Sequence, residues 1–266
     1  MYKYSEEHTT FLKKIKHDKF YVFLFRFLII FLFFILWELF TKLGYINVFL
    51  FSSPSLIIDT IVELICSNSL FKHICITLYE IFISFIISSF LGFIISSFLW
   101  RFKFLARVFD PYLTILNSLP KVALGPLIII WVGASLNSII FMALLISLFI
   151  TIINLYNGFI NTNVNYLKYM NSLNASKFMI YKTVIIPSNF TTIINTFRLN
   201  ISMTLIGVIM GELLVSKAGL GYLIMYGSQV FNINLVITSV LILGLISYIM
   251  YILIEKLEIY LLKRKS

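Results

Sequence analysis

An all-α membrane protein with about six transmembrane helices is the fold class that this sequence predicts, and three observations support it. Of the 266 residues 60% are apolar and only 12% are charged, and the mean hydropathy is +0.99. Soluble domains have about 45–50% apolar and about 25% charged residues. The apolar stretches are continuous rather than alternating with polar residues, so the spans are helices and not barrel strands.

This composition excludes several classes of protein. A soluble enzyme, a nucleic-acid-binding domain and a disordered chain would all need a more polar surface or less apolar content. The two cysteines, Cys66 and Cys75, have no metal-type spacing, and we interpret them as ordinary apolar side chains. We expect no metal, no cofactor and no nucleic acid bound to this chain.

Six segments are long and apolar enough to cross a bilayer, which takes about 20 residues. They are Phe20–Phe40, Ile74–Trp100, Pro111–Gly133, Ser138–Gly158, Phe190–Leu214 and Ile233–Ile254. Residues 1–19 form a predicted cytoplasmic N-terminal segment, and residues 20–262 form the predicted transmembrane domain.

The orientation follows from the lysines and arginines of the loops, which concentrate on the cytoplasmic side. With the N-terminus inside, fifteen of these cations are cytoplasmic: Lys3, Lys13, Lys14, Lys16, Lys19, Arg101, Lys103, Arg107, Lys168, Lys177, Lys182, Lys256, Lys263, Arg264 and Lys265. Only Lys42, Lys72 and Lys217 lie outside. Both termini are therefore predicted to be cytoplasmic, and the net charge of +10 is explained without nucleic acid.

An amphipathic helix is predicted after the first span. Ser53 is a suitable N-cap and Pro54 a suitable first residue, where the missing N–H has no consequence. Apolar and acidic side chains then fall on different faces. We expect this helix to lie on the outer surface of the membrane.

The third span contains features that favour a break. Asp110 and Pro111 resemble a cap and a first helical residue, and Pro120 and Pro126 lie further along. A broken span persists only where protein or a water-filled path covers the freed backbone groups.

Lys121 lies ten residues into this span, about 15 Å deep if the helix is straight. A cation at that depth is a candidate for the transport path, with Asn117 and Ser118 as neighbours. The alternative is that Lys121 reaches a cytoplasmic vestibule and has no role in transport.

Three further residues in the fifth span are candidates for function or packing. Glu212 ends the span near the outer face, where it either lines an outer gate on the path or caps a neighbouring helix. Gly207 and Gly211 form a G-x-x-x-G spacing that permits close helix approach. This packing is either within the chain or between two copies.

The longest cytoplasmic loop, residues 159–188, has apolar residues at helical spacing. It predicts two short helices that meet near Asn174, a residue type that tolerates a left-handed turn. Pro187 ends the loop. A partly apolar helical hairpin on this side is a natural docking surface for a soluble partner.

At this loop the sequence resembles the "EAA" loop of ABC importer permeases, which reads E-A-A-x-x-x-G-A-S with a proline at a fixed spacing after the glycine. Asn174 stands at the glycine position and Pro187 at the proline position, although Lys168, Tyr169 and Met170 replace E-A-A. Other segments are similar to the nitrate/sulfonate/taurine branch of this family. They are Leu36-Trp37-Glu38-Leu39, Ser52-Ser53-Pro54-Ser55, Thr77-Leu78-Tyr79, Pro120–Leu124, Pro126-Leu127, Trp131-Val132-Gly133, Glu212-Leu213-Leu214 and Ala218–Leu223.

The resemblance implies a type I ABC importer permease fold in the bacterial cytoplasmic membrane. It also implies ABC ATPase subunits, an extracytoplasmic substrate-binding protein and a second permease copy as partners, with membrane lipid around them. The residues expected to dock on the ATPase are Leu173, Asn174, Ala175, Ser176, Lys177 and Pro187.

The chain itself is not expected to be an enzyme. No glycine is followed by lysine, so the phosphate-binding loop G-x-x-x-x-G-K-[ST] is absent, and ATP is expected to bind to the partner ATPase. The substrate class predicted by the branch is a sulfonate-, taurine- or nitrate-like anion. A thiamine-precursor pyrimidine or another small nutrient is the alternative, and an ion-coupled secondary transporter is the alternative from another class.

Overall fold

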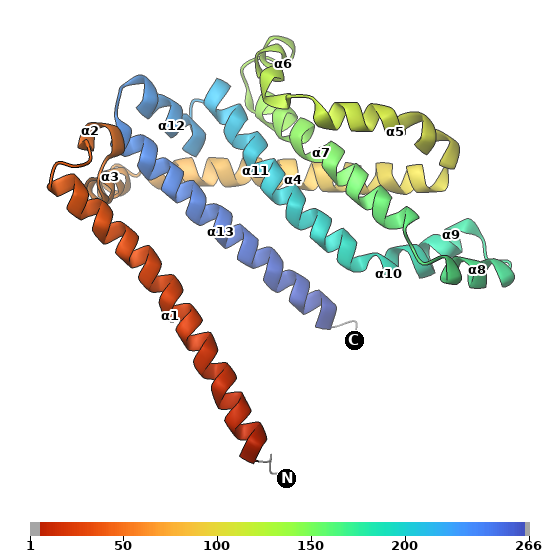
Figure 1. The fold of residues 1–266 in the computed structure, drawn as a ribbon. Coiled ribbons are helices and arrows are strands. Elements are labelled where there is room, and N and C mark those ends of the chain that lie inside the picture. Colours follow the sequence, from red (N-terminus) through yellow and green to blue (C-terminus); the bar gives the residue numbers. More distant parts are fainter. Residues whose placement is uncertain (1–5, 264–266) are drawn as a thin grey trace. The chain divides into compact units, whose positions relative to one another are not determined.

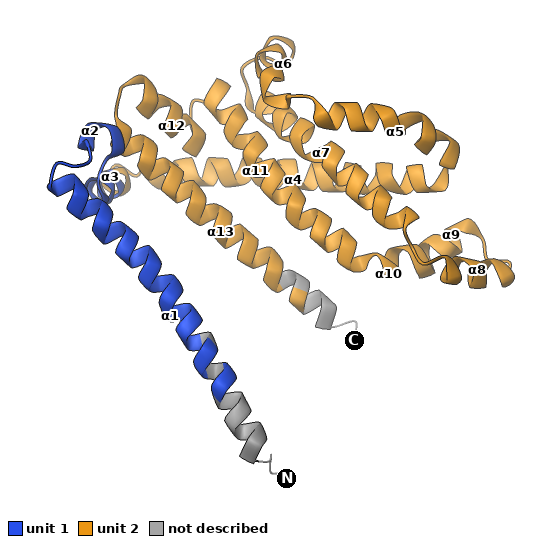
Figure 2. Cartoon of the chain, viewed as in Figure 1, with its two compact units in different colours: residues 1–63 blue, residues 64–266 orange. Residues whose placement is uncertain are grey.

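The computed structural model describes the backbone of residues 6–263, and the side chains of residues 14–256 except 16 and 19, together with that of residue 259. Part of the predicted N-terminal segment 1–19 therefore lies outside the described residues. The chain divides into two compact units, residues 1–63 and 64–266, which Figure 2 distinguishes by colour.

The first unit contains a long helix and two short ones. They are α1 (Glu6–Lys42), α2 (Val48–Phe51) and the start of α3 (Pro54–Cys66). The Ser53 hydroxyl accepts a hydrogen bond from the Leu56 N–H at 3.4 Å, so Ser53 and Pro54 begin α3 as the sequence predicts.

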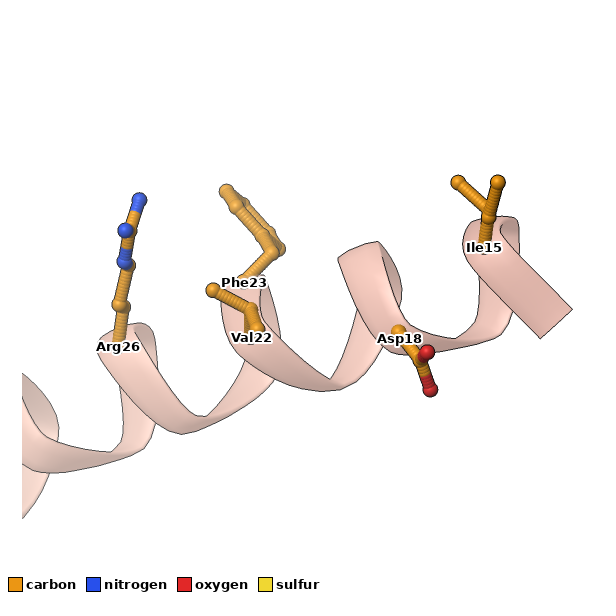
Figure 3. Close-up of a pocket in the computed structure, with 5 residues that line it drawn as sticks. All are labelled: Ile15, Asp18, Val22, Phe23 and Arg26. Atoms are coloured by element: carbon orange, nitrogen blue, oxygen red, sulfur yellow. The ribbon is translucent and has the colours of Figure 1, made fainter.

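A shallow hollow of about 360 Å³ lies along α1. Figure 3 shows that Ile15, Phe23 and Arg26 project to one side of the helix while Asp18 projects to another. The hollow is thus a groove on the surface of one helix, with no convergent polar groups.

All regular secondary structure in the described part of the second unit is helical (Figure 1). Its long helices are α4 (Ser69–Arg101), α7 (Leu136–Ile160), α11 (Phe190–Val215) and α13 (Ile233–Lys263). The shorter elements are α5 (Lys103–Ser118), η1 (Lys121–Leu124), α6 (Gly125–Val132), α8 (Val164–Ser172), α9 (Lys177–Ile180), η2 (Tyr181–Ile185), α10 (Ile186–Ser188) and α12 (Leu220–Gln229). Figure 1 shows α7, α11 and α13 running side by side, while α4 crosses α7 and α11.

The centre of this unit is the packing of α11 and α4 on α7. Gly207 and Gly211 lie on α11 where it meets α7, and a Cβ at Gly207 would overlap the Cα of Ala143. Ile139 stands against Gly211 in the same way. The structure therefore places the G-x-x-x-G spacing at a contact within the chain.

A buried polar cluster joins α4 to α11. Asn200, which is fully buried, donates a hydrogen bond to the Ser89 hydroxyl at 2.8 Å and accepts one from the Ser88 hydroxyl at 3.0 Å. Thr204 donates to the same Asn200 oxygen at 3.2 Å. Side-chain hydrogen bonds of this kind fasten helices together in lipid, where burial of apolar surface drives association only weakly.

The expectation of about six spans is confirmed. Among the described residues, five helices are long and apolar enough to cross a membrane. Helices α5 and α6, joined through η1, together form a sixth candidate, which is bent by 84°.

Two details of the predicted third span were wrong. Pro111 does not begin a helix, because α5 starts at Lys103 and contains Pro111 in its interior. Pro126 breaks nothing, because it lies in the first turn of α6, where no backbone hydrogen bond needs its nitrogen. The break lies at Leu119 and Pro120.

Candidate functional site

The loop between α7 and α11 contains the two predicted short helices, but Pro187 does not end it, because Pro187 lies within α10. Helices α8 and α9 meet at Asn174, which has a left-handed backbone with φ of 51°. From Lys177 the helical path continues through α9, the π-helical turn η2 and α10 to Asn189, directly before α11. The loop is therefore joined to α11 with almost no interruption.

Its inner face is fixed by a buried apolar cluster. The cluster consists of Leu155, Phe159, Ile180, Ile185 and Ile193, with Trp100, Leu167, Met170 and Ala175 packed around it. The Tyr181 ring lies 5.1 Å from the Trp100 ring, centroid to centroid, and its hydroxyl is hydrogen-bonded to that of Ser97 on α4. Burial raises the pKa of Tyr181, so the hydroxyl stays neutral.

The predicted docking residues fall into two groups. Leu173, at the tip, is 59% exposed, and Lys177 is exposed beside it. Ala175 is half-buried against the apolar cluster. The remaining members serve the backbone: Ser176 caps α9 through the Met179 N–H at 3.2 Å, Asn174 makes the turn, and Pro187 lies within α10. Leu173 is therefore the member best placed to contact another protein.

The broken span carries the predicted path residues. Lys121 is half-buried at the first residue of η1, where its Nζ donates a hydrogen bond to Asn117 Oδ1 at 3.2 Å and lies 5.6 Å from the centre of the Phe149 ring. Ser118 is exposed, and its hydroxyl donates back to the Ile115 carbonyl at 2.9 Å. Because the span bends by 84° at this point, the depth expected for Lys121 in a straight helix does not apply.

Glu212 takes part in a buried cap at the start of α12. Its Oε2 accepts the Gly221 N–H at 2.5 Å, and its Oε1 accepts the Thr77 hydroxyl at 2.6 Å. The Thr77 oxygen in turn accepts the Leu220 N–H at 2.8 Å, and His73 Nδ1 accepts the Gly219 N–H at 2.9 Å. Three successive backbone donors are thus satisfied by side chains from α4 and α11.

Gly219 is required by this arrangement on two grounds. Its φ of 116° suits only glycine, and a Cβ there would overlap the Glu212 carboxylate. Glu80 lies next to Glu212 on the α4 side, fully buried and with one oxygen that has no partner.

A second carboxylate has the same role in the first unit. Glu38 accepts the Ser55 N–H at 3.1 Å, within the first turn of α3, and pairs with Lys42 at 3.0 Å. The sequence segments around Glu38 and Ser53 that carry the resemblance therefore meet at a helix cap.

Sequence reasoning missed His73, Thr77 and Tyr181 as members of these contacts. Thr77 and Tyr181 are ordinary residues in apolar runs, and nothing in their spacing signals a partner in a distant segment of the chain. Only the four-residue separation of His73 and Thr77, one helical turn, indicates a shared face. Within the described residues, no group of three His, Cys, Asp or Glu side chains converges as a metal site.

With this geometry in view, the comparison with known families is decisive. A family model described as "Binding-protein-dependent transport system inner membrane component" matches residues 84–258, more than half of the chain. The chain belongs to this family. It is accordingly a multi-pass inner-membrane permease subunit of an ABC importer rather than an enzyme, and the family implies an ATPase and a substrate-binding protein as partners. The secondary-transporter alternative is thereby overturned.

Curated relatives agree on the role and differ in substrate. The chain is 27% identical to a putative aliphatic sulfonates transport permease, SsuC of Bacillus subtilis, over 87% of this chain and 84% of that protein. It is 28% identical to the formylaminopyrimidine transport permease ThiX of Halalkalibacterium halodurans, over 80% of this chain and 85% of that protein. It is also 28% identical to the riboflavin transport permease RibX of Chloroflexus aurantiacus, over 84% of each.

The solved structures confirm the permease's fold. A chain of the MetNI methionine ABC transporter, solved in inward-facing conformations, superposes with a TM-score of 0.60 at 16% identity. The match covers 70% of this permease and 94% of that chain. The type I importer permease fold is thus shown.

The cap at α12 leads to a prediction about Gly219. Gly219→Ala should lower stability by about 1–3 kcal/mol more than Gly133→Ala, because both glycines have positive φ but only Gly219 faces a carboxylate. Thermal unfolding of both variants in detergent measures the difference. Hydrogen exchange of residues 219–223 should accelerate in Gly219→Ala alone, and equal effects in the two variants would contradict the cap.

Proposed function

We propose that this permease moves a small anionic solute of the sulfonate, taurine or nitrate type. The observation that carries the proposal is the half-buried Lys121 at the break in the third span, hydrogen-bonded to Asn117. A cation in a low-dielectric region attracts an anion strongly. The relative named as a sulfonate permease supports the same class.

The break also supports a path along this span. Residues 114–120 are exposed in the single chain, and the backbone leaves the helix at Leu119 and Pro120. Irregular backbone does not persist against lipid, so protein or water must cover it in the membrane. Asn117, Ser118 and Lys121 would line that covered space, whereas Glu212 is buried in the cap of α12.

A second permease copy would supply this cover. Exposed apolar side chains flank the break on both helices, with Tyr112 and Ile115 on α5 and Ile130 and Trp131 on α6. A homodimer joined here would enclose the two breaks around one path. A partner permease of similar type would satisfy the same constraint.

The loop at residues 159–188 would dock on the ATPase. Leu173 and Phe178 are 59% and 75% exposed on a loop that lies between spans, so their apolar surface needs a partner. The apolar cluster beneath them packs the loop against α7 and α11. By the distribution of loop charges, this loop and both termini would face the cytoplasm, where ATP is available.

A neutral heteroaromatic solute is the second candidate. The relatives named for formylaminopyrimidine and riboflavin support it, and the Phe149 ring beside Lys121 offers a surface for stacking. Binding-protein-dependent ATPase stimulation, tested with an alkanesulfonate, formylaminopyrimidine and riboflavin, distinguishes the two candidates. Stimulation by a sulfonate is the expected result.

Lys121→Met should reduce uptake about tenfold or more, because one charge-assisted contact to the solute is lost. Lys121→Arg should be milder, since it keeps the charge. Uptake into vesicles containing the full complex measures the effect, and Lys72→Met, which removes an exposed cation elsewhere, is the control. Uptake at the unmodified rate in Lys121→Met would remove Lys121 from the path.

Leu173→Arg should leave the permease in the membrane while reducing uptake about tenfold or more, because docking would bury a charge that has no partner. Leu173→Met keeps the apolar contact and serves as the matched control. Copurification of the ATPase and ATP hydrolysis are measured alongside uptake. Normal uptake in Leu173→Arg would refute docking at the tip.

The mass of the purified active complex should correspond to two permease chains. The variant Ile115→Cys, in a Cys66→Ser, Cys75→Ser background, should form a cross-link between two copies. One permease chain per active complex would contradict both the homodimer and the pairing with a similar permease. Two different permease chains in the complex would indicate pairing with a similar permease.

A further inference from the structure

A hollow of about 450 Å³ lies where α4, α5 and α7 meet the loop of residues 159–188, called the docking loop below. Its lining carries four cations, which come from three separate elements: Arg101 ends α4, Lys103 and Arg107 lie in the first two turns of α5, and Lys177 begins α9. Segments that are far apart in the chain therefore bring positive charge to one place.

Described residues do not neutralise these cations. The described part of the chain shows an ion pair only between Lys42 and Glu38, so none of the four has a described carboxylate within 4 Å. Asp110, one turn beyond Arg107, is the acidic residue of α5, and its charge acts on Tyr156, which lines the hollow. Four cations beside this one carboxylate leave the described lining with a net positive charge.

The rest of the lining suits the boundary between headgroups and acyl chains. Trp100 and Tyr156 contribute amphipathic rings, and Phe159 and Ile180 form an apolar floor that belongs to the buried cluster. Asn171 adds a polar side chain. Tryptophan and tyrosine are enriched at this level of a membrane, next to the basic residues that contact phosphate groups.

The surroundings favour a lipid over a free phosphate. Phe98, Phe102 and Phe104 lie beside the hollow in the chain and are 50%, 42% and 70% exposed, at the end of a span where acyl chains are available to cover them. Arg101 lies 5.3 Å from the centre of the Phe102 ring, so this cation adjoins the exposed phenylalanines. A soluble anion would bind to the cations but would leave the exposed phenylalanines uncovered.

We propose that this hollow binds the phosphate headgroup of an anionic phospholipid, with the acyl chains along the exposed phenylalanines. The lipid would then touch α4, α5 and the docking loop together. The site is distinct from the transport path at Lys121, and its existence does not depend on the nature of the transported solute.

The three tryptophans allow a direct test, since Trp100 alone lines the hollow. In a Trp37→Phe, Trp131→Phe background, the purified complex is placed in phosphatidylcholine nanodiscs that contain a small fraction of brominated phosphatidylglycerol or brominated phosphatidylcholine. Quenching of Trp100 should be several-fold stronger with the anionic lipid. Neutralising Arg101→Gln and Arg107→Gln together should reduce this preference about fivefold or more.

Lys168→Gln, which removes an exposed cation of α8 that does not line the hollow, is the matched control and should keep the preference. Equal quenching by the two lipids would overturn the proposal. Loss of the preference on adding millimolar inorganic phosphate or glycerol phosphate would show a soluble ligand and overturn the lipid assignment.

Two further outcomes are informative. If the double variant keeps its lipid preference but loses the copurifying ATPase, the cations contact protein and the proposal fails. If the double variant does not assemble, Arg107→Lys and Arg107→Gln replace it. The proposal then requires the lysine variant to keep more of the preference than the glutamine variant.

Discussion

Every backbone donor and acceptor of this permease that lies within the bilayer needs a partner from protein or trapped water, and the structure is arranged around this requirement. Long helices satisfy it internally. Where a helix begins after a turn at the end of a span, its first N–H groups have no partner within the helix. A side chain from a different element accepts from them, as Glu212 does for α12 and Glu38 for α3. Both carboxylates accept from N–H groups in a first helical turn, where the helix dipole adds to the attraction.

The same requirement explains why the third span differs from the others. Its backbone leaves the helix at Leu119 and Pro120, and the backbone hydrogen bonds there are local: the Leu119 N–H donates to the Ile115 carbonyl and the Ala123 N–H donates to the Pro120 carbonyl. No side-chain cap forms at the start of η1. The break is thus held by its own backbone, whereas the start of α12 is held by side chains from α4 and α11.

Much of this fold could be predicted from the sequence, because lipid makes the signal strong. Span existence follows from apolar length, and the turn at Asn174 and the start of α3 follow from local chemistry that Asn174, Ser53 and Pro54 carry themselves. The boundaries of α5 could not be predicted, because Asp110 and Pro111 imitate a helix start that tertiary packing on α4 and α7 overrides.

The contacts of the candidate site were predicted unevenly for a related reason. The sequence marks Lys121 and Glu212 because a charge in an apolar run is conspicuous. It does not mark Thr77, His73 or the bond from Tyr181 to Ser97, since these are short polar side chains or aromatic residues whose partners come from distant segments. Pairings between distant segments depend on how the helices cross, and hydropathy carries no information about crossing.

The continuity between the docking loop and α11 has a mechanical consequence. Helix α11 has 26 residues and is therefore about 39 Å long, with the end of the docking loop at one terminus and Glu212 near the other. Rotation of such a rod by about 5° about its loop end displaces the far end by about 3 Å, which is the length of a hydrogen bond. A small angular change at the loop end is thus large enough, at the opposite end of the helix, to make or break the hydrogen bonds that hold the first turn of α12.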